Sequence, residues 1–296
     1  MKNKKLISLF ALATSALIFV SCKSDSSSDS TVTIPTNSVT EATTSYKVSY
    51  VPGTMDAMEG KTKFQIIVTD LDGVALATTP TVTLAPMMTM ESYSHAAPHQ
   101  GCTNVDASTW DCVVYYLMPS EMNGTVMGTW DLGVTVEAET ASFTIDVGMA
   151  MNGSGKYVLK GGSGDQSMSM AGGSEGRSYF IFKSAVDSAN GTMDVFVATK
   201  ESMTSFPTLV DGITLNAGTM YEYAVSNPTV KVSTDMTTWT AMTDGGDGTF
   251  QATGLSLTAD SETTIYFQLS DDNETKTTDG TTADGTNDFV SITFTP

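Results

Sequence analysis

Short runs in which apolar and polar residues alternate make up most of the chain from Ser45 onward, and Gly, Asp, Asn and Pro separate them. Alternation with a period of two residues is typical of strands that bury one face. Apart from an apolar segment at the N-terminus, no long stretch repeats with the helical period. The sequence therefore predicts an all-β protein. The expected strands cover residues 46–51, 63–69, 80–84, 113–117, 129–136 and 141–147, then 177–186, 193–199, 221–225, 229–233, 250–257, 263–269 and 289–294.

The predicted strands fall into two sets. Gly and Ser cluster at 151–155, 161–164 and 171–176, which places a domain boundary near residue 149. The first set has the length and strand count of an immunoglobulin-like β-sandwich. We therefore predict two immunoglobulin-like β-sandwich domains, residues 45–148 and 149–296, joined near residue 149.

The N-terminus has the parts of a secretory signal. Lysines at positions 2, 4 and 5 precede an apolar run over 6–20, which is too short to span a bilayer, and Ser21-Cys22 follows. A cysteine at that place predicts a lipoprotein signal peptide over residues 1–21, with lipid attached to Cys22. Phe19 stands where such signals usually carry Leu, so a plain signal peptide with a chance cysteine is the alternative.

Residues 22–44 are rich in Ser and Thr, have little to bury and are predicted to be a flexible tether. Lys23 follows the lipidated cysteine where enterobacterial sorting reads Asp as an inner-membrane signal, and this favours the outer membrane. The periplasmic and surface faces both stay open.

The charge of the chain limits its partners. It has 14 basic and 33 acidic residues, a net charge of −19, and removal of the leader takes three lysines more. Such a chain is repelled by nucleic acid and by anionic lipid surfaces. We expect no nucleic-acid partner, and we expect membrane attachment through the lipid at Cys22 alone.

Two cysteines remain after lipidation of the first. An exported chain with a leftover pair usually forms a disulfide, so we predict a bond between Cys102 and Cys112. The residues between them include Asn104, Asp106 and Ser108, a composition typical of a hairpin turn. A thiolate metal site is the alternative.

Methionine and histidine gather in one part of the sequence. Both histidines, His95 and His99, follow Met88 and Met90, and ten of the 18 methionines fall between residues 87 and 170. In an extended chain, residues two apart point to the same face, so each Met-x-Met pair can present two thioethers to one ion. Thioether and imidazole together suit Cu(I). The predicted ligands are Met88, Met90, His95 and His99, with Met118 and Met127 on neighbouring strands. The alternative is that these methionines fill gaps in a core.

A family resemblance points the same way. Residues 62–69, the turn at 70–73, residues 80–90, Met118-Pro119 and residues 127–134 together resemble the YtkA-like family, which is related to FixH-like domains. The resemblance covers about residues 60–140. It implies a small immunoglobulin-like sandwich in an exported protein, often associated with copper or heavy-metal handling.

Enzyme signatures are weak, and we expect a protein that is not an enzyme. Residues 172–176 match the G-x-S-x-G string of a nucleophile elbow, but no histidine follows His99, so we interpret this segment as linker. The acidic loop over 271–285 is either solvated or a Ca²⁺ site of irregular spacing. The sequence thus favours a copper-binding envelope lipoprotein. The alternative is a surface interaction protein whose loops bind a carbohydrate or an envelope protein.

Overall fold

The computed structural model describes residues 31–169 and 172–296, and within these ranges all regular structure is strand. The prediction of an all-β fold is confirmed. The predicted signal peptide and Cys22 lie outside the described residues. Among the described residues, no helix has the length and apolar character needed to cross a membrane.

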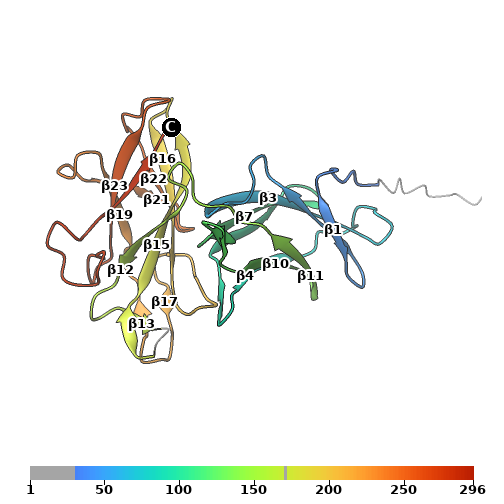
Figure 1. Cartoon of the computed structure of the whole chain (residues 1–296), viewed down its shortest axis with the longest axis horizontal. Helices are drawn as coiled ribbons and strands as arrows, with labels where there is room; N and C mark the ends of the chain where they lie inside the picture. The colour runs from blue at the N-terminus through green and yellow to red at the C-terminus, as the bar shows by residue number, and fades with distance from the viewer. Residues whose placement is uncertain (1–30, 170–171) are drawn as a thin grey trace, which may run out of the picture.

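Two sheets packed face to face form the N-terminal sandwich (Figure 1). The first has the order β1 (Val39–Ala42), β2 (Lys47–Pro52), β3 (Gly60–Thr69), β7 (Thr109–Tyr116) and β6 (His99–Asn104). The second has the order β11 (Glu139–Ile145), β10 (Thr129–Val136), β4 (Val82–Thr89) and β5 (Ser94–Ala96). A small hairpin, β8 (Glu121–Met122) with β9 (Thr125–Val126), extends from one end.

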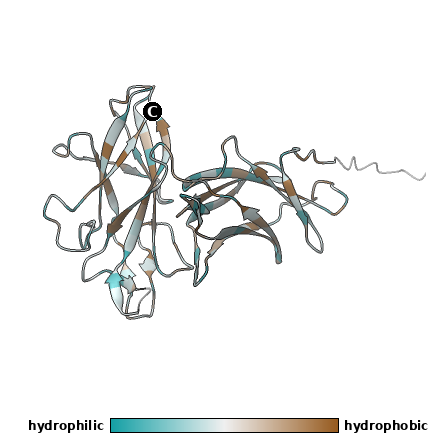
Figure 2. Cartoon of the chain, in the orientation of Figure 1, coloured by the Kyte–Doolittle hydropathy of each residue, from teal (hydrophilic) through white to brown (hydrophobic). Residues whose placement is uncertain are grey.

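Alternation along the strands fills the space between these sheets. In β10, Trp130, Leu132, Val134 and Val136 are buried and the residues between them are more exposed. They face the alternating residues of β3, such as Phe64 and Ile66, in one core. Figure 2 shows the same pattern as apolar residues that interrupt polar ones along each strand.

The C-terminal sandwich repeats this plan. Its first sheet has the order β12 (Lys156–Lys160), β15 (Ser178–Asp187), β16 (Thr192–Thr199), β22 (Thr249–Ala252) and β21 (Thr243–Asp244). Its second has the order β20 (Thr240–Ala241), β19 (Thr229–Ser233), β23 (Thr263–Ser270) and β24 (Val290–Phe294). Two hairpins flank them, β13 (Gln166–Met168) with β14 (Ser174–Gly176) and β17 (Thr214–Leu215) with β18 (Tyr223–Ala224).

A third apolar core joins the two sandwiches. Tyr115 of β7 is fully buried and stacks on Phe196 of β16, with the ring centroids 4.2 Å apart. Around this pair lie Leu117, Phe180, Phe182 and Ala198, all buried. Because aromatic side chains contribute large buried areas, this shared core fixes how one sandwich sits on the other.

Two predictions about segments outside the main strands are wrong. Residues 39–42 were expected in a flexible tether, but they form β1, which pairs with β2 from Val39↔Tyr50 to Ala42↔Lys47. All four are exposed, so no buried alternation marks them as a strand. Residues 172–176 were expected to be linker, but 174–176 form β14, which pairs with β13.

The disulfide between Cys102 and Cys112 is present, and its prediction is confirmed. The two cysteines are directly opposed partners of the β6–β7 hairpin. The thiolate alternative therefore falls away.

Candidate metal centre

Five of the six predicted ligands lie at one end of the N-terminal sandwich. There the end of β4 with the residue after it, the short strand β5, the segment just before β10 and the segment after β7 come together. These elements carry Met88 and Met90, His95, Met127 and Met118. The four methionines belong to or pack against one core, and His95 contacts that core through Trp130.

His95 occupies a core position. It is the cross-strand partner of Met88, and Met88 is in turn the partner of Trp130 on the other side. All three side chains are buried, with 4%, 0% and 0% of their surfaces exposed. The imidazole meets the indole edge to face at 5.1 Å, and the indole Nε1–H donates a hydrogen bond to the Met118 carbonyl at 3.0 Å. Side chains directly opposed on one face of a sheet are close neighbours, so this row brings Met88 and His95 together.

The ring nitrogens of His95 have unequal partners. Nδ1 lies 2.9 Å from the Ala96 carbonyl oxygen, which can only accept, so Nδ1 carries the hydrogen in the neutral ring. Nε2 then presents a lone pair, and it lies 3.3 Å from the sulfur of Met118. A thioether has no hydrogen to donate. Two electron-pair donors thus face each other in a buried place.

Burial lowers the pKa of His95, although the hydrogen bond to Ala96 opposes this in part. The ring is therefore neutral at pH 7 and offers Nε2 as a ligand without losing a proton. A ligating histidine typically donates its other ring N–H to a carbonyl or carboxylate, as His95 does to Ala96.

Met90 and Met127 lie on the outer side of this row. Both are half-buried and line a surface pocket formed by residues 89–93 and 125–129. Gly128 lets these elements approach closely, because a Cβ atom there would stand 2.9 Å from Cε of Met88 and 3.1 Å from Cγ of Met90. The pocket thus borders two methionines that pack against the core containing Met88.

His99 does not join this group, and its inclusion among the predicted ligands is not supported by the geometry. The chain passes from one sheet to the other between β5 and β6, so the two histidines lie on strands of different sheets. His99 lines a separate pocket together with Pro86 of β4 and with Phe206, which belongs to the C-terminal sandwich. Its Nδ1 is buried and has no hydrogen-bond partner among the described residues.

The ligand set is made of one imidazole and several thioethers. Nowhere in the described ranges do three or more His, Cys, Asp or Glu side chains come together as a metal site. Hard cations such as Ca²⁺ need oxygen ligands, whereas thioether sulfur suits Cu(I). The chemistry of these side chains therefore matches the predicted metal.

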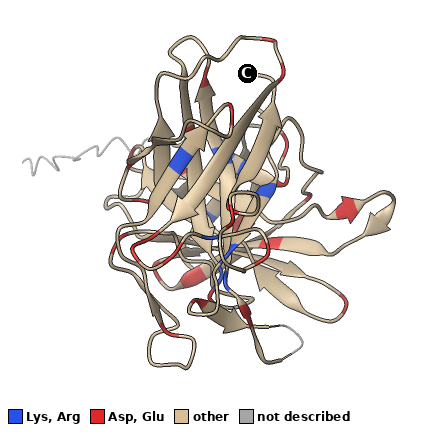
Figure 3. Ribbon diagram, turned by 90° about the vertical axis from the view of Figure 1, so that its left-hand side faces the viewer, with Lys and Arg blue, Asp and Glu red and all other residues tan. Residues whose placement is uncertain are grey.

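The sequence did not reveal a buried ion cluster in the C-terminal sandwich, which comprises Asp165, Arg177, Asp271, Glu274 and Lys276. Arg177 Nε lies 2.7 Å from Asp165, and Lys276 Nζ lies 2.9 Å from the other oxygen of the same carboxylate. Asp271 and Glu274 also pair with Lys276, at 3.2 and 2.9 Å. Figure 3 shows acidic residues spread over the loops and basic ones mostly toward the middle of the view, where the two sandwiches overlap.

Every N–H group of the Arg177 guanidinium donates a hydrogen bond, so we interpret the ion cluster as a structural brace that holds the surrounding loops together. Its guanidinium donates to Asp165, to the carbonyls of Gln166, Lys200 and Tyr221, and to the Asn216 side chain. Two of the carboxylates considered for Ca²⁺, Asp271 and Glu274, already hold Lys276.

No family model and no curated protein matches this chain. Among solved structures, it is similar to titin domains A168–A170, at 8% identity and a TM-score of 0.20, over 78% of this chain and 62% of that one. It is also similar to titin domains Z1Z2 in complex with telethonin (10%, 0.21, 86% and 98%) and to domains 5–6 of the S-layer protein SbsC (13%, 0.21, 88% and 99%). The chain thus spans about 62% of the length of the titin A168–A170 chain. At these TM-scores the likenesses carry no argument, and it is the two antiparallel sheets of each unit that make both units β-sandwiches.

Proposed function

We propose that this chain is an envelope lipoprotein of the outer membrane, without enzymatic activity, that binds Cu(I) through His95 and Met118. Met88 completes the inner ligand group, and Met90 with Met127 passes the ion inward from the surface pocket. The observation that carries the proposal is the Nε2 lone pair of His95 facing the Met118 sulfur at 3.3 Å.

The separation of these two atoms suits a shared ion. Ligand nitrogen stands about 2.0 Å and ligand sulfur about 2.3 Å from a bound metal. Two such atoms can lie 3.3 Å apart and still reach one ion between them. Without an ion, the buried imidazole nitrogen has no hydrogen-bond donor at that position, which is unfavourable.

Trp130 adds to the same site. Its ring lies beside His95 and is fully buried, so an ion at Nε2 would lie close to an aromatic surface. Aromatic rings attract cations, most strongly where water is excluded. The indole also holds Met118 in place through the hydrogen bond from Nε1 to its carbonyl.

The test is an anaerobic Cu(I) titration against a competing chelator, with protein carrying Cys22→Ala so that it stays free of lipid. Met118→Leu and Met88→Leu each remove one sulfur at nearly constant volume, which a core tolerates well. We expect either change to weaken Cu(I) binding at least tenfold. Met193→Leu is the matched control for Met88→Leu, because Met193, like Met88, is fully buried, but in the other sandwich.

A second control separates the two histidines. His95→Gln should abolish tight binding, whereas His99→Gln should leave it unchanged because His99 lies in another pocket. Equal affinity in parent and Met118→Leu protein would refute the site. Absence of Cu(I) binding in the parent would refute the function and favour the surface interaction protein with a carbohydrate or protein partner.

The lipid anchor rests on the sequence around Cys22 and has its own test. Cys22→Ser removes the acylated thiol, so the protein should leave the detergent phase in a phase-partition experiment. Protease treatment of intact cells would then distinguish the periplasmic from the surface face. Retention of the Cys22→Ser protein in the detergent phase would refute lipidation at this residue.

A further inference from the structure

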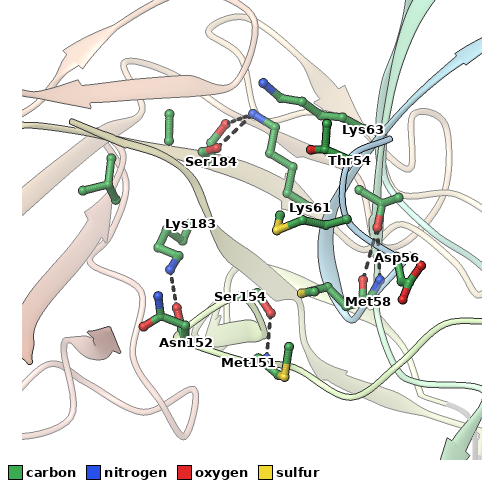
Figure 4. Close-up of a pocket in the computed structure, with 14 residues that line it drawn as sticks. Thr54, Asp56, Met58, Lys61, Lys63, Met151, Asn152, Ser154, Lys183 and Ser184 are labelled. Carbon is green, nitrogen blue, oxygen red and sulfur yellow. Dashed lines mark hydrogen bonds between the residues drawn. The ribbon is translucent and has the colours of Figure 1, made fainter. Parts of the chain in front are cut away.

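An interdomain cleft lies between the two sandwiches (Figure 4). One wall comes from the β2–β3 loop and β3, and the other from β15 and the connecting segment at 151–154. Its cavity volume of about 530 Å³ falls in the range of small-molecule sites. The lining residues are Thr54, Met55, Asp56, Met58, Lys61, Thr62, Lys63, Met151, Asn152, Ser154, Lys183, Ser184, Ala185 and Val186.

Three lysines that form no ion pair with a carboxylate line this cleft. Lys61, Lys63 and Lys183 are three of the 14 basic residues of a chain with 33 acidic ones. None of the three forms an ion pair with a carboxylate in the part of the chain that the structure describes. In a protein this acidic, three unpaired lysines in one cavity point to an anionic ligand.

The lysines keep hydrogen-bond donors free. An ammonium has three donors, and Lys61 uses two of them on the carbonyl and hydroxyl oxygens of Ser184, at 3.0 and 2.7 Å. Lys183 donates to the Asn152 carbonyl and lies over the Phe294 ring. Nζ of Lys63 makes no hydrogen bond to any described residue. Lys61 is thus held in position with one donor left for a ligand.

The rest of the lining is suited to a hydroxylated ligand. Thr54 offers a hydroxyl, and Asp56, next to Met58 in Figure 4, offers a carboxylate that accepts from hydroxyls. Asn152 and Ser154 are polar too, but the Asn152 amide already pairs with the Thr295 backbone and the Ser154 hydroxyl with Glu59 and Met151. Met58 and Met151 form an apolar wall. A sugar ring combines hydroxyls with an apolar face, so this mixture matches a saccharide better than a simple inorganic anion.

We propose that the interdomain cleft binds a saccharide that carries a carboxylate, of the uronate class. Lys61 and Lys63 would receive the carboxylate, and the side chains around Asn152 and Met151 would receive the ring. The site is preformed, because the shared core of Tyr115 and Phe196 fixes both walls. Preformed sites avoid the entropy cost of ordering on binding.

The pH dependence follows from Lys61. Burial and the neighbouring charge of Lys63 lower the pKa of Lys61 to about 8, and Asp194 opposes this in part. Asp56 is the other charged group that lines the cleft besides the three lysines. Because the anion needs the charged ammonium, affinity for it should fall as the pH rises through about 8, while a neutral sugar should show no such fall.

The experiment is calorimetric titration of the protein with Cys22→Ala by digalacturonate, its dimethyl ester and inorganic phosphate. We expect saturable binding of digalacturonate alone, weakened at least tenfold by Lys61→Gln and by Lys63→Gln. Lys231→Gln is the matched control, since Lys231 is exposed on β19 and also lacks an ion-pair partner among the described residues. It should change the affinity less than twofold.

Four results would overturn the proposal. These are no saturable binding of digalacturonate, equal binding of the ester, equal binding of phosphate, or equal weakening by Lys231→Gln. Thermal melts of each variant show whether it is folded, so a loss of binding is read only from variants that melt like the parent. Because the titration contains no copper, its outcome is independent of the metal site.

Discussion

Replacing Asp165 by Ala would test the brace of the C-terminal sandwich. Asp165 is fully buried and is the only carboxylate within ion-pair distance of Arg177 in the described chain. Lys276 would keep Asp271 and Glu274 as partners. The change therefore leaves one buried charge, that of Arg177, without a counter-ion.

The expected loss is large compared with typical stabilities. Removing one partner of a buried ion pair costs about 3–5 kcal/mol. The Tyr179 hydroxyl, which donates to Asp165, also loses its acceptor, and an unsatisfied buried group costs about 1–3 kcal/mol. These effects overlap, so we expect the free energy of unfolding to fall by about 4 kcal/mol, against a usual total of about 5–15 kcal/mol.

The assay is urea denaturation followed by tryptophan fluorescence and circular dichroism, with the slope m compared between variants. Glu175→Ala is the matched control, since Glu175 pairs with Lys200 at 2.9 Å but is 40% exposed. The Lys200 side chain is 11% exposed, so we expect this pair to contribute about 1 kcal/mol, the upper end of the range for exposed pairs. If the Asp165→Ala protein is too unstable to fold, Asp165→Asn keeps the size and part of the hydrogen bonding. A loss below about 1 kcal/mol in either Asp165 variant would refute the reasoning.

Two further predictions concern the N-terminal sandwich and its junction. Tyr115→Ala removes the ring stacked on Phe196, at a cost of about 3–5 kcal/mol, so calorimetry should show two separate transitions where the parent shows one; a single transition in the variant would contradict this. Reducing the Cys102–Cys112 bond opens a loop of sequence separation 10, so dithiothreitol should lower the free energy of unfolding by about 2–3 kcal/mol, and an unchanged urea midpoint would contradict it.

The sequence predicted some strands closely and others only in part, since 80–84 and 113–117 cover parts of β4 (Val82–Thr89) and β7 (Thr109–Tyr116). The run at 129–136 has the same bounds in the structure as in the prediction, because every second residue from Trp130 to Val136 faces the core. Strand β1 was missed because its side chains are all exposed and only its backbone pairs with β2. Hydrophobic pattern reports which face is buried, and it carries little information about an edge strand that buries neither face.

The candidate sites were harder to predict, because each depends on contacts between segments far apart in sequence. Sequence proximity suggested that His95 and His99 act together, but the change of sheet between β5 and β6 separates them. The buried ion cluster joins Asp165 to Lys276 across 111 positions, and each residue alone looks like an ordinary surface charge. The Gly- and Ser-rich composition of residues 161–176 is typical of a linker, so nothing in the sequence indicated that Asp165 in this segment is buried.

The proposed metal centre also involves the second sandwich. Ala96, next to His95, donates its N–H to the carbonyl of Met203 at 2.8 Å. Lys156 of β12 donates to the carbonyl of Leu117, the residue before Met118, and forms an ion pair with Glu59 at 3.0 Å. Leu117 itself is part of the shared core. His95 and Met118 are the residues that would bind copper. The residue next to each of them, Ala96 and Leu117, is hydrogen-bonded to the C-terminal sandwich. The N-terminal sandwich carries the proposed ligands, while their positions depend on contacts with the C-terminal sandwich at the neighbouring residues Ala96 and Leu117.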